Sequence, residues 1–330
     1  LTLPPPRGRE PDTWTYGPAR RQGVVVDANT PGVATPLDAR DLTPPFTPGA
    51  LRGGSHVHVW NPAGDRVSFT YDDHILDTST NPDAEPNQRN IGVSVIGSPV
   101  TVPRTHPRNH DGSAFSVLVS KTVAKPTPGS DEISRAFEEA WLGDRRLAFQ
   151  GLVTLADGSV ISEVFLLELP DDLTHPGDGP LEGTPTRRPA PPRGAVQRRL
   201  TRTESHRFPG LSGPRHWLRS NPDGTRIGFL KMDDAGIVQF WTVSPAGEVV
   251  QVTRNPEPVA SAFTWHPDGR HVAFAVGTQV CVADVRTGTT TPVTADCHPA
   301  TAPRPEACVF SPDGSRIAFV RHFPDGNQIH

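Results

Sequence analysis

Nearly the same nine residues occur four times in this chain, and no other sequence feature restricts the fold as strongly. The copies read Asn61-Pro-Ala-Gly-Asp-Arg-Val-Ser-Phe69, Asn221-Pro-Asp-Gly-Thr-Arg-Ile-Gly-Phe229, His266-Pro-Asp-Gly-Arg-His-Val-Ala-Phe274 and Ser311-Pro-Asp-Gly-Ser-Arg-Ile-Ala-Phe319. The last three begin at positions 221, 266 and 311, which are 45 residues apart. A period of about 40 to 50 residues is typical of one four-stranded blade of a β-propeller. The repeat therefore predicts an all-β propeller.

Each copy predicts a β-hairpin. In the Pro-Asp-Gly core, proline fixes one backbone dihedral and glycine accepts the positive φ that other residues resist, as in a tight turn. In the third copy an apolar run at 261–265 precedes the turn, and an alternating pattern at 270–275 follows it. Such a pair is typical of two strands with one buried face. Strand patterns at 279–284 and 291–294 complete four strands before the next copy begins.

Counting strands in this way divides the chain into blades. Full blades are predicted over 54–105, 112–203, 215–256 and 260–299, each starting at the strand that lines the central channel, with partial blades over 12–48 and 306–330. The two partial blades either close into one blade or mark the chain as a fragment of a six- or seven-bladed ring. The fragment is favoured, because a third strand begins at Asn327 just before the chain stops at His330.

Two segments interrupt the strand patterns. Residues 131–142 follow a serine, begin with Asp131 and Glu132, and carry apolar residues at helical spacing, which predicts one short inserted helix. Residues 170–199 are dominated by proline, glycine and arginine. Because such a composition buries too little apolar surface to order itself, we expect a mobile surface loop there.

The composition excludes several partners. The 330-residue chain has a net charge of -4, so it lacks the basic surface that binds nucleic acid. A stretch of about 18 apolar residues is absent, which argues against a membrane-spanning helix. The chain begins at Leu1 without a charged and then apolar leader. Since a signal peptide is either removed or outside this sequence, the compartment stays open between cytoplasm and periplasm.

The repeat also carries a family resemblance. The pattern from Ser311 to Phe319 resembles the signature of TolB-type, WD-like β-propellers, and its specificity for that fold is high. Further phrases across most of the chain resemble a bacterial propeller family of unknown function; they are 53–58, 128–135, 136–141, 214–217 and 304–308. The resemblance implies a TolB-like propeller with residues before the equivalent of Leu1, and it implies no established activity.

Register across the copies predicts a candidate site, because the first strand of each blade lines the central channel. Five positions before each copy stand His56, His216, Ser261 and Glu306, and three positions before the first copy stands His58. Side chains two apart on a strand share a face. One opening of the channel is therefore predicted to present His56, His58, His216 and Glu306, with Arg215 and Arg304 just before their strands.

This set predicts a metal site. Two histidines separated by one strand residue, His56 and His58, point their imidazoles the same way, and with a carboxylate they suit zinc, manganese or iron. The alternative is that these groups fill a hydrated channel and are satisfied by water. His106 and His110, at the predicted junction of two blades, are secondary candidates.

The first copy and the strand before it carry a second resemblance. Residues 56–64 and 67–72 resemble the metal-binding blade of oligogalacturonate lyases, TolB-type propellers that cleave oligouronides by β-elimination. The resemblance implies that the histidine pair ligates manganese together with a further histidine and a glutamine. The position of that glutamine is Gly53 here, so Glu306 or His216 would have to replace the missing ligand.

An elimination of this kind needs a base and a positive charge. The base removes the proton next to the uronate carboxylate, and a cation or metal stabilises the resulting enediolate. His216 is the predicted base, and Arg215 or Arg304 is the predicted clamp, since the planar arginine fork matches a carboxylate. The alternative interpretation places both arginines at ordinary surface positions.

Two functions remain in view. The first is a propeller that binds a small anionic ligand, an oligouronide or sugar acid, in a histidine-lined channel and acts on it as a metal-dependent lyase. The second is a non-catalytic, TolB-like interaction platform that docks a protein or peptide on one rim. Three histidines and a glutamate at matched positions favour the first. The fold alone decides neither, because propellers host unrelated activities.

Overall fold

A computed structural model describes residues 2, 3, 15–306 and 308–330 of the protein. The chain forms two compact units. The first unit comprises residues 1–147, 151–154 and 167–198, and the second unit comprises residues 148–150, 155–166 and 199–330. Residues 12–14, where the predicted partial blade 12–48 begins, lie outside the described residues.

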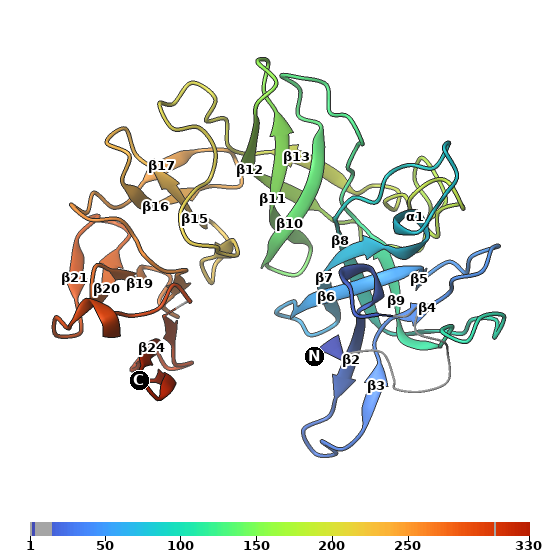
Figure 1. Ribbon diagram of the computed structural model, residues 1–330, viewed down its shortest axis with the longest axis horizontal. Helices are drawn as coiled ribbons and strands as arrows, with labels where there is room; N and C mark the ends of the chain where they lie inside the picture. Colours follow the sequence, from blue (N-terminus) through green and yellow to red (C-terminus); the bar gives the residue numbers. More distant parts are fainter. Residues whose placement is uncertain (1, 4–14, 307) are drawn as a thin grey trace. The chain divides into compact units, whose positions relative to one another are not determined.

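The first unit contains small sheets and one complete four-stranded sheet (Figure 1). Strands β1 to β3 form a three-stranded sheet, β4 pairs with β5 in parallel, and β6 to β9 form an antiparallel sheet in chain order. The elements are β1 (Thr2–Leu3), η1 (Pro18–Arg20), β2 (Gln22–Val26), β3 (Ala34–Pro36), β4 (Ala39–Arg40), β5 (Ala50–Leu51), β6 (Gly53–Trp60), β7 (Arg66–Asp73), α1 (His74–Asp77), β8 (Asn90–Val100) and β9 (Gly112–Leu118).

The next four-stranded sheet contributes residues to both units. Its strands follow chain order and are β10 (Ile133–Leu142), β11 (Arg146–Thr154), β12 (Val160–Glu168) and β13 (Val196–Arg199).

The second unit adds two more four-stranded sheets and two hairpins. The first sheet consists of β14 (Arg219–Ser220), β15 (Ile227–Met232), β16 (Val238–Val243) and β17 (Val249–Gln251). The second consists of β18 (Thr264–Trp265), β19 (His271–Val276), β20 (Gln279–Asp284) and β21 (Thr290–Pro292). After η2 (Pro299–Thr301), β22 (Val309–Phe310) pairs with β23 (Ile317–Ala318), and β24 (Val320–Phe323) pairs with β25 (Gly326–Ile329).

The nine-residue repeat forms the hairpin between the first two strands of its sheet, as the sequence predicts. It joins β6 to β7, β14 to β15, β18 to β19 and β22 to β23. In the first copy the Asn61 side-chain oxygen accepts hydrogen bonds from the N–H groups of Asp65 and Arg66 at 3.1 and 3.0 Å. Gly64 has a φ of 72°, which glycine adopts without strain. Successive four-stranded antiparallel sheets with this hairpin confirm the all-β propeller.

Two elements differ from the sequence prediction. Residues 112–118 form the fourth strand of the first full sheet, whereas the predicted second blade begins at 112. The helix predicted at 131–142 is wrong, because Ile133–Leu142 form β10. The serine and acid that resemble a helix start close a turn instead: Ser130 Oγ donates to the carbonyl of Thr127 at 2.7 Å, and Glu132 accepts from the Thr127 N–H at 2.8 Å.

The proline- and arginine-rich segment 170–199 is anchored to the first unit, which corrects the expectation of a mobile loop. The guanidinium of Arg52, only 1% of whose side-chain surface is exposed, donates to the carbonyls of Thr184 and Arg187, the latter at 2.7 Å. Glu85 forms ion pairs with Arg187 and Arg188, both at 2.9 Å. Polar contacts with distant residues thus supply the order that the segment's own composition cannot.

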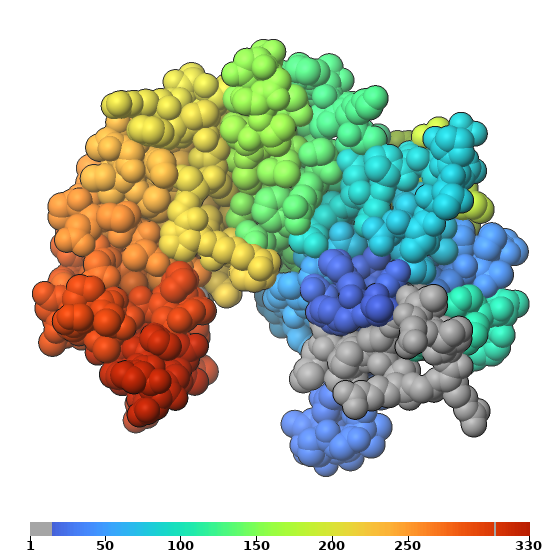
Figure 2. All heavy atoms as spheres, viewed as in Figure 1, coloured from blue at the N-terminus to red at the C-terminus, as the bar shows by residue number. Residues whose placement is uncertain are grey.

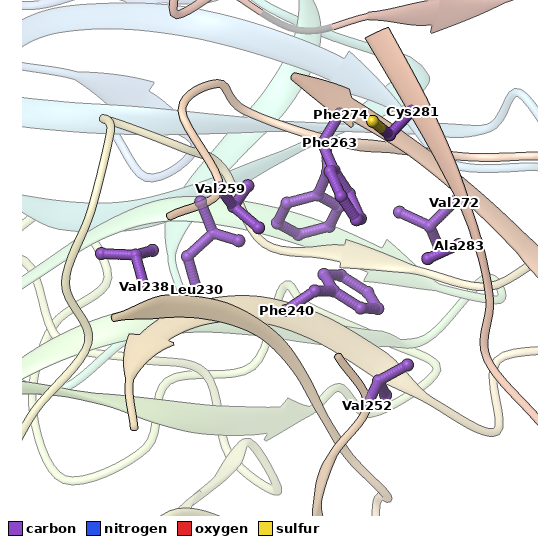
Figure 3. Close-up of a cluster of buried hydrophobic side chains, with 10 residues drawn as sticks. All are labelled: Leu230, Val238, Phe240, Val252, Val259, Phe263, Val272, Phe274, Cys281 and Ala283. Carbon is purple, nitrogen blue, oxygen red and sulfur yellow. The ribbon is translucent and has the colours of Figure 1, made fainter. Parts of the chain in front are cut away.

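Aromatic and aliphatic side chains from two neighbouring sheets form a core in the second unit (Figure 3). The rings of Phe240 and Phe263 meet edge to face, with centroids 4.8 Å apart. Phe274 from β19 is also fully buried in this cluster. Each buried phenylalanine stabilises the fold by about 1.5–3 kcal/mol through removal of apolar surface from water. The alternating residues that follow the turns of the second and third copies, such as Leu230, Val272 and Phe274, supply part of this core.

The β2–β3 hairpin ends in an exposed tip. Residues 26–35 are all solvent-exposed, and the space-filling view shows the tip standing out from the visible face of the first unit (Figure 2). Among the residues that the structure describes, the helices are too short to cross a lipid bilayer.

Candidate functional site

The predicted metal pair lies on β6, and a β-bulge separates its two histidines. The pairing of β6 with β7 shifts between His56 and Val59. Between them Val57 has a φ of 58°, in the left-handed region that β-branched residues avoid. A bulge inserts one extra residue into a strand, so the alternation of side chains is interrupted at this point.

The bulge places His56 and His58 on opposite faces of the sheet. His56 pairs with Thr70, and its chain neighbour Ser55 pairs with Tyr71, so these two positions face opposite ways. The Nε2 atom of His58 lies 3.1 Å from Ser55 Oγ, which puts His58 on the face of Ser55. The expectation that both imidazoles point the same way is therefore wrong.

His58 belongs to a buried polar chain with Ser55 and Asp38. The Ser55 hydroxyl donates to Asp38 Oδ1 at 2.9 Å, so it accepts from His58 Nε2. Asp38 also accepts from the Gly23 N–H at 3.2 Å. Burial raises the pKa of Asp38 and lowers the pKa of His58 to about 4, so the imidazole is neutral at pH 7. These hydrogen bonds link β6 to the segment after β3, and both Ser55 and Asp38 are fully buried.

The other face of β6 holds a carboxyl group that the sequence analysis missed. Thr70, the cross-strand partner of His56, donates through Oγ1 to Glu139 Oε2 at 3.2 Å. Glu139 is 2% exposed, and its Oε1 has no hydrogen-bond partner among the described residues. Burial is the largest effect on its pKa and raises it to about 7, against the lowering hydrogen bonds from Thr70 and Ser68.

A sequence pattern shared by β6 and β10 could have identified Glu139. Val57 on β6 and Glu138 on β10, with a φ of 56°, are the positive-φ residues other than glycine in the described part of the chain. Each is followed by a titratable residue and, three positions on, by a tryptophan. Trp141 Nε1 donates to the carbonyl of Val59 at 2.9 Å and so joins the two strands. Aligning these two strands would have identified the carboxyl, but the helix predicted at 131–142 concealed the match.

His216 lacks the free nitrogen that a base or a metal ligand needs. Its Nδ1 lies 2.9 Å from the carbonyl of Pro214, to which it donates, and its Nε2 accepts from the Leu230 N–H at 3.1 Å. Burial lowers the pKa of this imidazole to about 4. In this geometry His216 cross-links the main chain within the second unit.

The other predicted residues of the second unit are also engaged locally. Arg215 places its guanidinium 4.6 Å from the ring centroid of Trp217, a cation–π contact. Arg304 forms an ion pair with Glu306 at 3.2 Å, and the side chain of Glu306 is 54% exposed. The carboxylate predicted as a metal ligand thus neutralises the arginine predicted as a substrate clamp.

The two secondary histidines lie in a different place from the one predicted. His106 and His110 belong to the connection between β8 and β9, the third and fourth strands of one sheet, and not to a junction of two blades. His106 Nδ1 accepts from the Arg108 N–H at 3.1 Å, and the main chain of His110 pairs with that of Arg40. Burial is the main cause that lowers the pKa of His110 to about 4.

A pocket of about 1060 Å³ lies beneath the anchored loop of the first unit. Its walls are residues 119–123, which continue from β9, residues 131–133 at the start of β10, and parts of the loop between 177 and 197. Gln197 ties two walls together, because its side chain exchanges hydrogen bonds with the main chain of Lys121 at 2.9 and 3.1 Å. The loop prolines supply apolar surface, and arginine and lysine side chains supply charge.

The charges in this pocket are unevenly satisfied. Glu85 is held by two arginines, Glu132 accepts from a main-chain N–H, and Asp178 lies 3.6 Å from Lys121 Nζ. The guanidinium of Arg193, by contrast, has no hydrogen bond or ion pair with the part of the chain that the structure describes. The guanidinium of Arg193 therefore offers the pocket a positive charge together with unused hydrogen-bond donors.

Comparison with solved structures shows the fold. Puromycin hydrolase, as the S511A mutant complexed with PGG, matches with a TM-score of 0.56 and 13% identity over 95% of this chain and 40% of that one. TolB from Acinetobacter baumannii gives a TM-score of 0.45 and 15% identity over 94% of this chain and 57% of that one. This chain spans less than two thirds of the length of both proteins.

Sequence comparison shows the family. Residues 6–110 match a family described as "Protein of unknown function (DUF3748)". The "Uncharacterized protein YidR" of Escherichia coli (strain K12) is 48% identical over 323 residues, which cover 96% of this chain and 75% of that protein. With its propeller sheets, this chain therefore belongs to the uncharacterised propeller family of Escherichia coli YidR.

Proposed function

We propose that this protein is a binding propeller that takes an elongated small anionic ligand in the pocket beneath the 170–199 loop. The observation that supports the proposal is the guanidinium of Arg193, which lines the pocket and makes no side-chain hydrogen bond or ion pair with residues 2, 3, 15–306 and 308–330. A planar guanidinium matches a carboxylate with two parallel hydrogen bonds. Lys121, whose side chain is 68% exposed and paired only loosely with Asp178, is the second cation available to such a ligand.

The size of the pocket supports a ligand longer than one sugar or one amino acid. Pockets for small molecules commonly measure about 300–1,000 Å³, and this pocket measures about 1060 Å³. Proline rings on one wall offer apolar contact, and cations offer contact to carboxylates. Two sources of this chemistry are an oligouronide and a short acidic peptide, and the experiment below distinguishes them.

The lyase predicted from the sequence is not part of this proposal. Its base, His216, has both ring nitrogens in hydrogen bonds with the main chain, and its metal pair points to opposite faces of β6. Manganese, zinc or iron at His56 or His58 stays a prediction. The proposed function shares the absence of catalysis with the alternative function, the interaction platform. It differs from that alternative because the ligand is a small acidic molecule.

Calorimetric titration tests the proposal with a galacturonic acid trimer and with a hexaglutamate peptide. We expect one of the two acids to bind, with an affinity that falls as salt rises. Arg193→Gln should weaken binding at least tenfold, which corresponds to about 1.4 kcal/mol. Arg198→Gln is the matched control, because Arg198 lies on the same segment outside the pocket lining and should leave affinity unchanged.

Two outcomes would overturn the proposal. If the parent protein binds neither acid at low salt, the pocket does not recognise carboxylates. If Arg193→Gln and Arg198→Gln weaken binding equally, the effect arises from general charge and not from the pocket.

A further inference from the structure

We propose that the turn between β18 and β19 is a binding site for a divalent transition metal, formed by His266, Asp268 and His271. The three residues offer ligand atoms that all lie within 4.8 Å of one another. Asp268 Oδ1 lies 3.0 Å from His266 Nδ1, and Asp268 Oδ2 lies 2.6 Å from His271 Nδ1. The register argument from the sequence selects neither histidine, and the cluster becomes apparent only in the folded turn.

The other copies of the repeat show that the histidines are not needed to build the turn. In the second copy, Asn221 Oδ1 accepts from the Arg226 N–H at 2.8 Å, and in the fourth copy Ser311 Oγ accepts from the Arg316 N–H at 3.0 Å. His266 occupies the position of Asn221 and Ser311, and the corresponding N–H is bound by the aspartate instead.

The main-chain frame of the turn is otherwise the same in this copy. The His266 N–H donates to the carbonyl of His271 at 2.8 Å, as the Asn221 N–H donates to the carbonyl of Arg226 at 3.0 Å. Gly269 and Gly224 have φ values of 70° and 68°. The third copy therefore keeps the hairpin and differs only in its side chains. The imidazole of His266 replaces an amide or hydroxyl group, and the imidazole of His271 replaces a guanidinium group.

The neighbouring blade restricts which nitrogen of His266 is offered. A Cβ atom at Gly314 would lie 2.1 Å from His266 Nε2, so this nitrogen is covered by the β22–β23 turn. The ring also packs edge to face on Phe310, with centroids 4.9 Å apart. Nδ1 thus points into the turn, where it lies 3.0 Å from Asp268 Oδ1 and accepts from the Asp268 N–H at 3.0 Å. A metal bound at Nδ1 would replace this hydrogen bond.

The local charge does not oppose a cation. Arg270, inside the turn, forms hydrogen bonds and an ion pair with Asp284, including Nε to Oδ1 at 3.0 Å. His271 also lines a pocket of about 440 Å³, which gives water access to one side of the cluster.

Two imidazoles and one carboxylate select the metal class. This donor set suits zinc, copper, nickel, cobalt or iron, whereas calcium and magnesium prefer oxygen ligands alone. Bonds of about 2.1 Å in a four-coordinate site place ligand atoms about 3.4 Å apart. The observed separations bracket this value, since the two contacts with Asp268 measure 3.0 and 2.6 Å and all ligand atoms lie within 4.8 Å of one another. Metal binding would replace the hydrogen bond between His271 Nδ1 and Asp268 Oδ2.

The test uses zinc chloride and nickel chloride titrated into the untagged, chelator-treated chain by calorimetry. We expect one ion to bind per chain at this turn. His266→Asn and His271→Arg install the residues of the second copy, so they should preserve the hairpin while weakening binding at least tenfold. His322→Asn, at an exposed histidine in another hairpin, is the matched control and should leave binding unchanged.

Thermal unfolding without metal shows whether the variants fold. Melting temperatures close to that of the parent, together with lost metal binding, would support the site. Absence of zinc and nickel binding by the parent would overturn it, and so would equal binding by His266→Asn, His271→Arg and the parent.

Discussion

Glu139 is expected to make the stability of the first unit fall as the pH rises. Its side chain is buried against Thr70, and burial raises its pKa from an ordinary value of 4.5 to about 7. Between these values the folded protein keeps the proton while the unfolded chain releases it. Rising pH therefore stabilises the unfolded state until the folded carboxyl also ionises near pH 7.

The magnitude follows from the two pKa values. They differ by about 2.5, and one pKa unit corresponds to about 1.4 kcal/mol, so the total effect is about 3 kcal/mol. Between pH 5 and pH 8 the carboxyl lowers the free energy of unfolding by about 2–3 kcal/mol, because part of the change occurs below pH 5. Other buried acids and histidines add their own dependence, so only the difference from a variant isolates Glu139.

Glu139→Gln removes the ionisable group and keeps a neutral side chain of nearly the same shape. Its amide oxygen can accept from Thr70 as the protonated carboxyl does. Urea unfolding of the parent and the variant at pH 5 and pH 8 should show a pH dependence that is smaller by about 2–3 kcal/mol in the variant. Glu168→Gln is the control, since this carboxyl is exposed and should not alter the dependence.

Equal pH dependence in the parent and Glu139→Gln would refute the reasoning. If the variant fails to fold, a carbon-13 titration of the parent's glutamate carboxyl groups decides the question. One carboxyl resonance should titrate near pH 7, and its absence would refute the raised pKa of Glu139.

Three further changes test the structural roles assigned above. Arg52 Nε forms an ion pair with the buried carboxylate of Asp73 at 2.8 Å. Arg52→Met removes this partner and releases the 170–199 loop, so it should cost about 3–5 kcal/mol in urea unfolding and expose the loop to limited proteolysis; unchanged stability and cleavage would contradict the anchoring. Val57→Gly relieves a left-handed valine and should stabilise the protein by about 1 kcal/mol, whereas Val59→Gly in extended backbone should destabilise it; equal effects would argue against strain at the bulge. His216→Ala removes two hydrogen bonds to the main chain and should lower stability by about 2 kcal/mol without changing bound metal, and loss of metal with unchanged stability would return His216 to the metal site.

Local sequence signals were sufficient for the hairpins. The Pro-Asp-Gly turn needs glycine at a positive φ, and the apolar alternation after it forms the core of its blade, so turn and strands follow from neighbouring residues. The assignment of β9 failed for the opposite reason. Residues 112–118 have an ordinary strand pattern, and only their pairing with β8 shows to which sheet they belong.

The β10 strand shows how a local signal can mislead. A serine followed by acids is typical of a helix start, and the same groups also close turns. The left-handed residue Glu138 interrupts the alternation that would have identified a strand. The periodicity of this one segment therefore predicted a helix where a strand forms. The tryptophan three positions after Glu138, which matches the one three positions after Val57 on β6, would have indicated the strand.

The candidate sites depended on geometry that register alone does not contain. His56 and His58 occupy matched positions in the sequence, but one extra residue at the bulge turns them to opposite faces. His216 also occupies a matched position, and the carbonyl of Pro214 and the N–H of Leu230 use both its nitrogens. Counting positions gives the order of side chains along a strand, but not their partners.

The sequence by itself determined the repeating hairpin, the all-β propeller and the family, because each depends on residues adjacent in the chain or on a fixed period. The tertiary structure alone decided which polar groups are free. Folding brings the Leu230 N–H to His216 and the carbonyl of Arg187 to Arg52. It brings no such partner among the described residues to the guanidinium of Arg193. Such pairing depends on which segments meet when the sheets fold, and no pattern within one segment specifies that meeting.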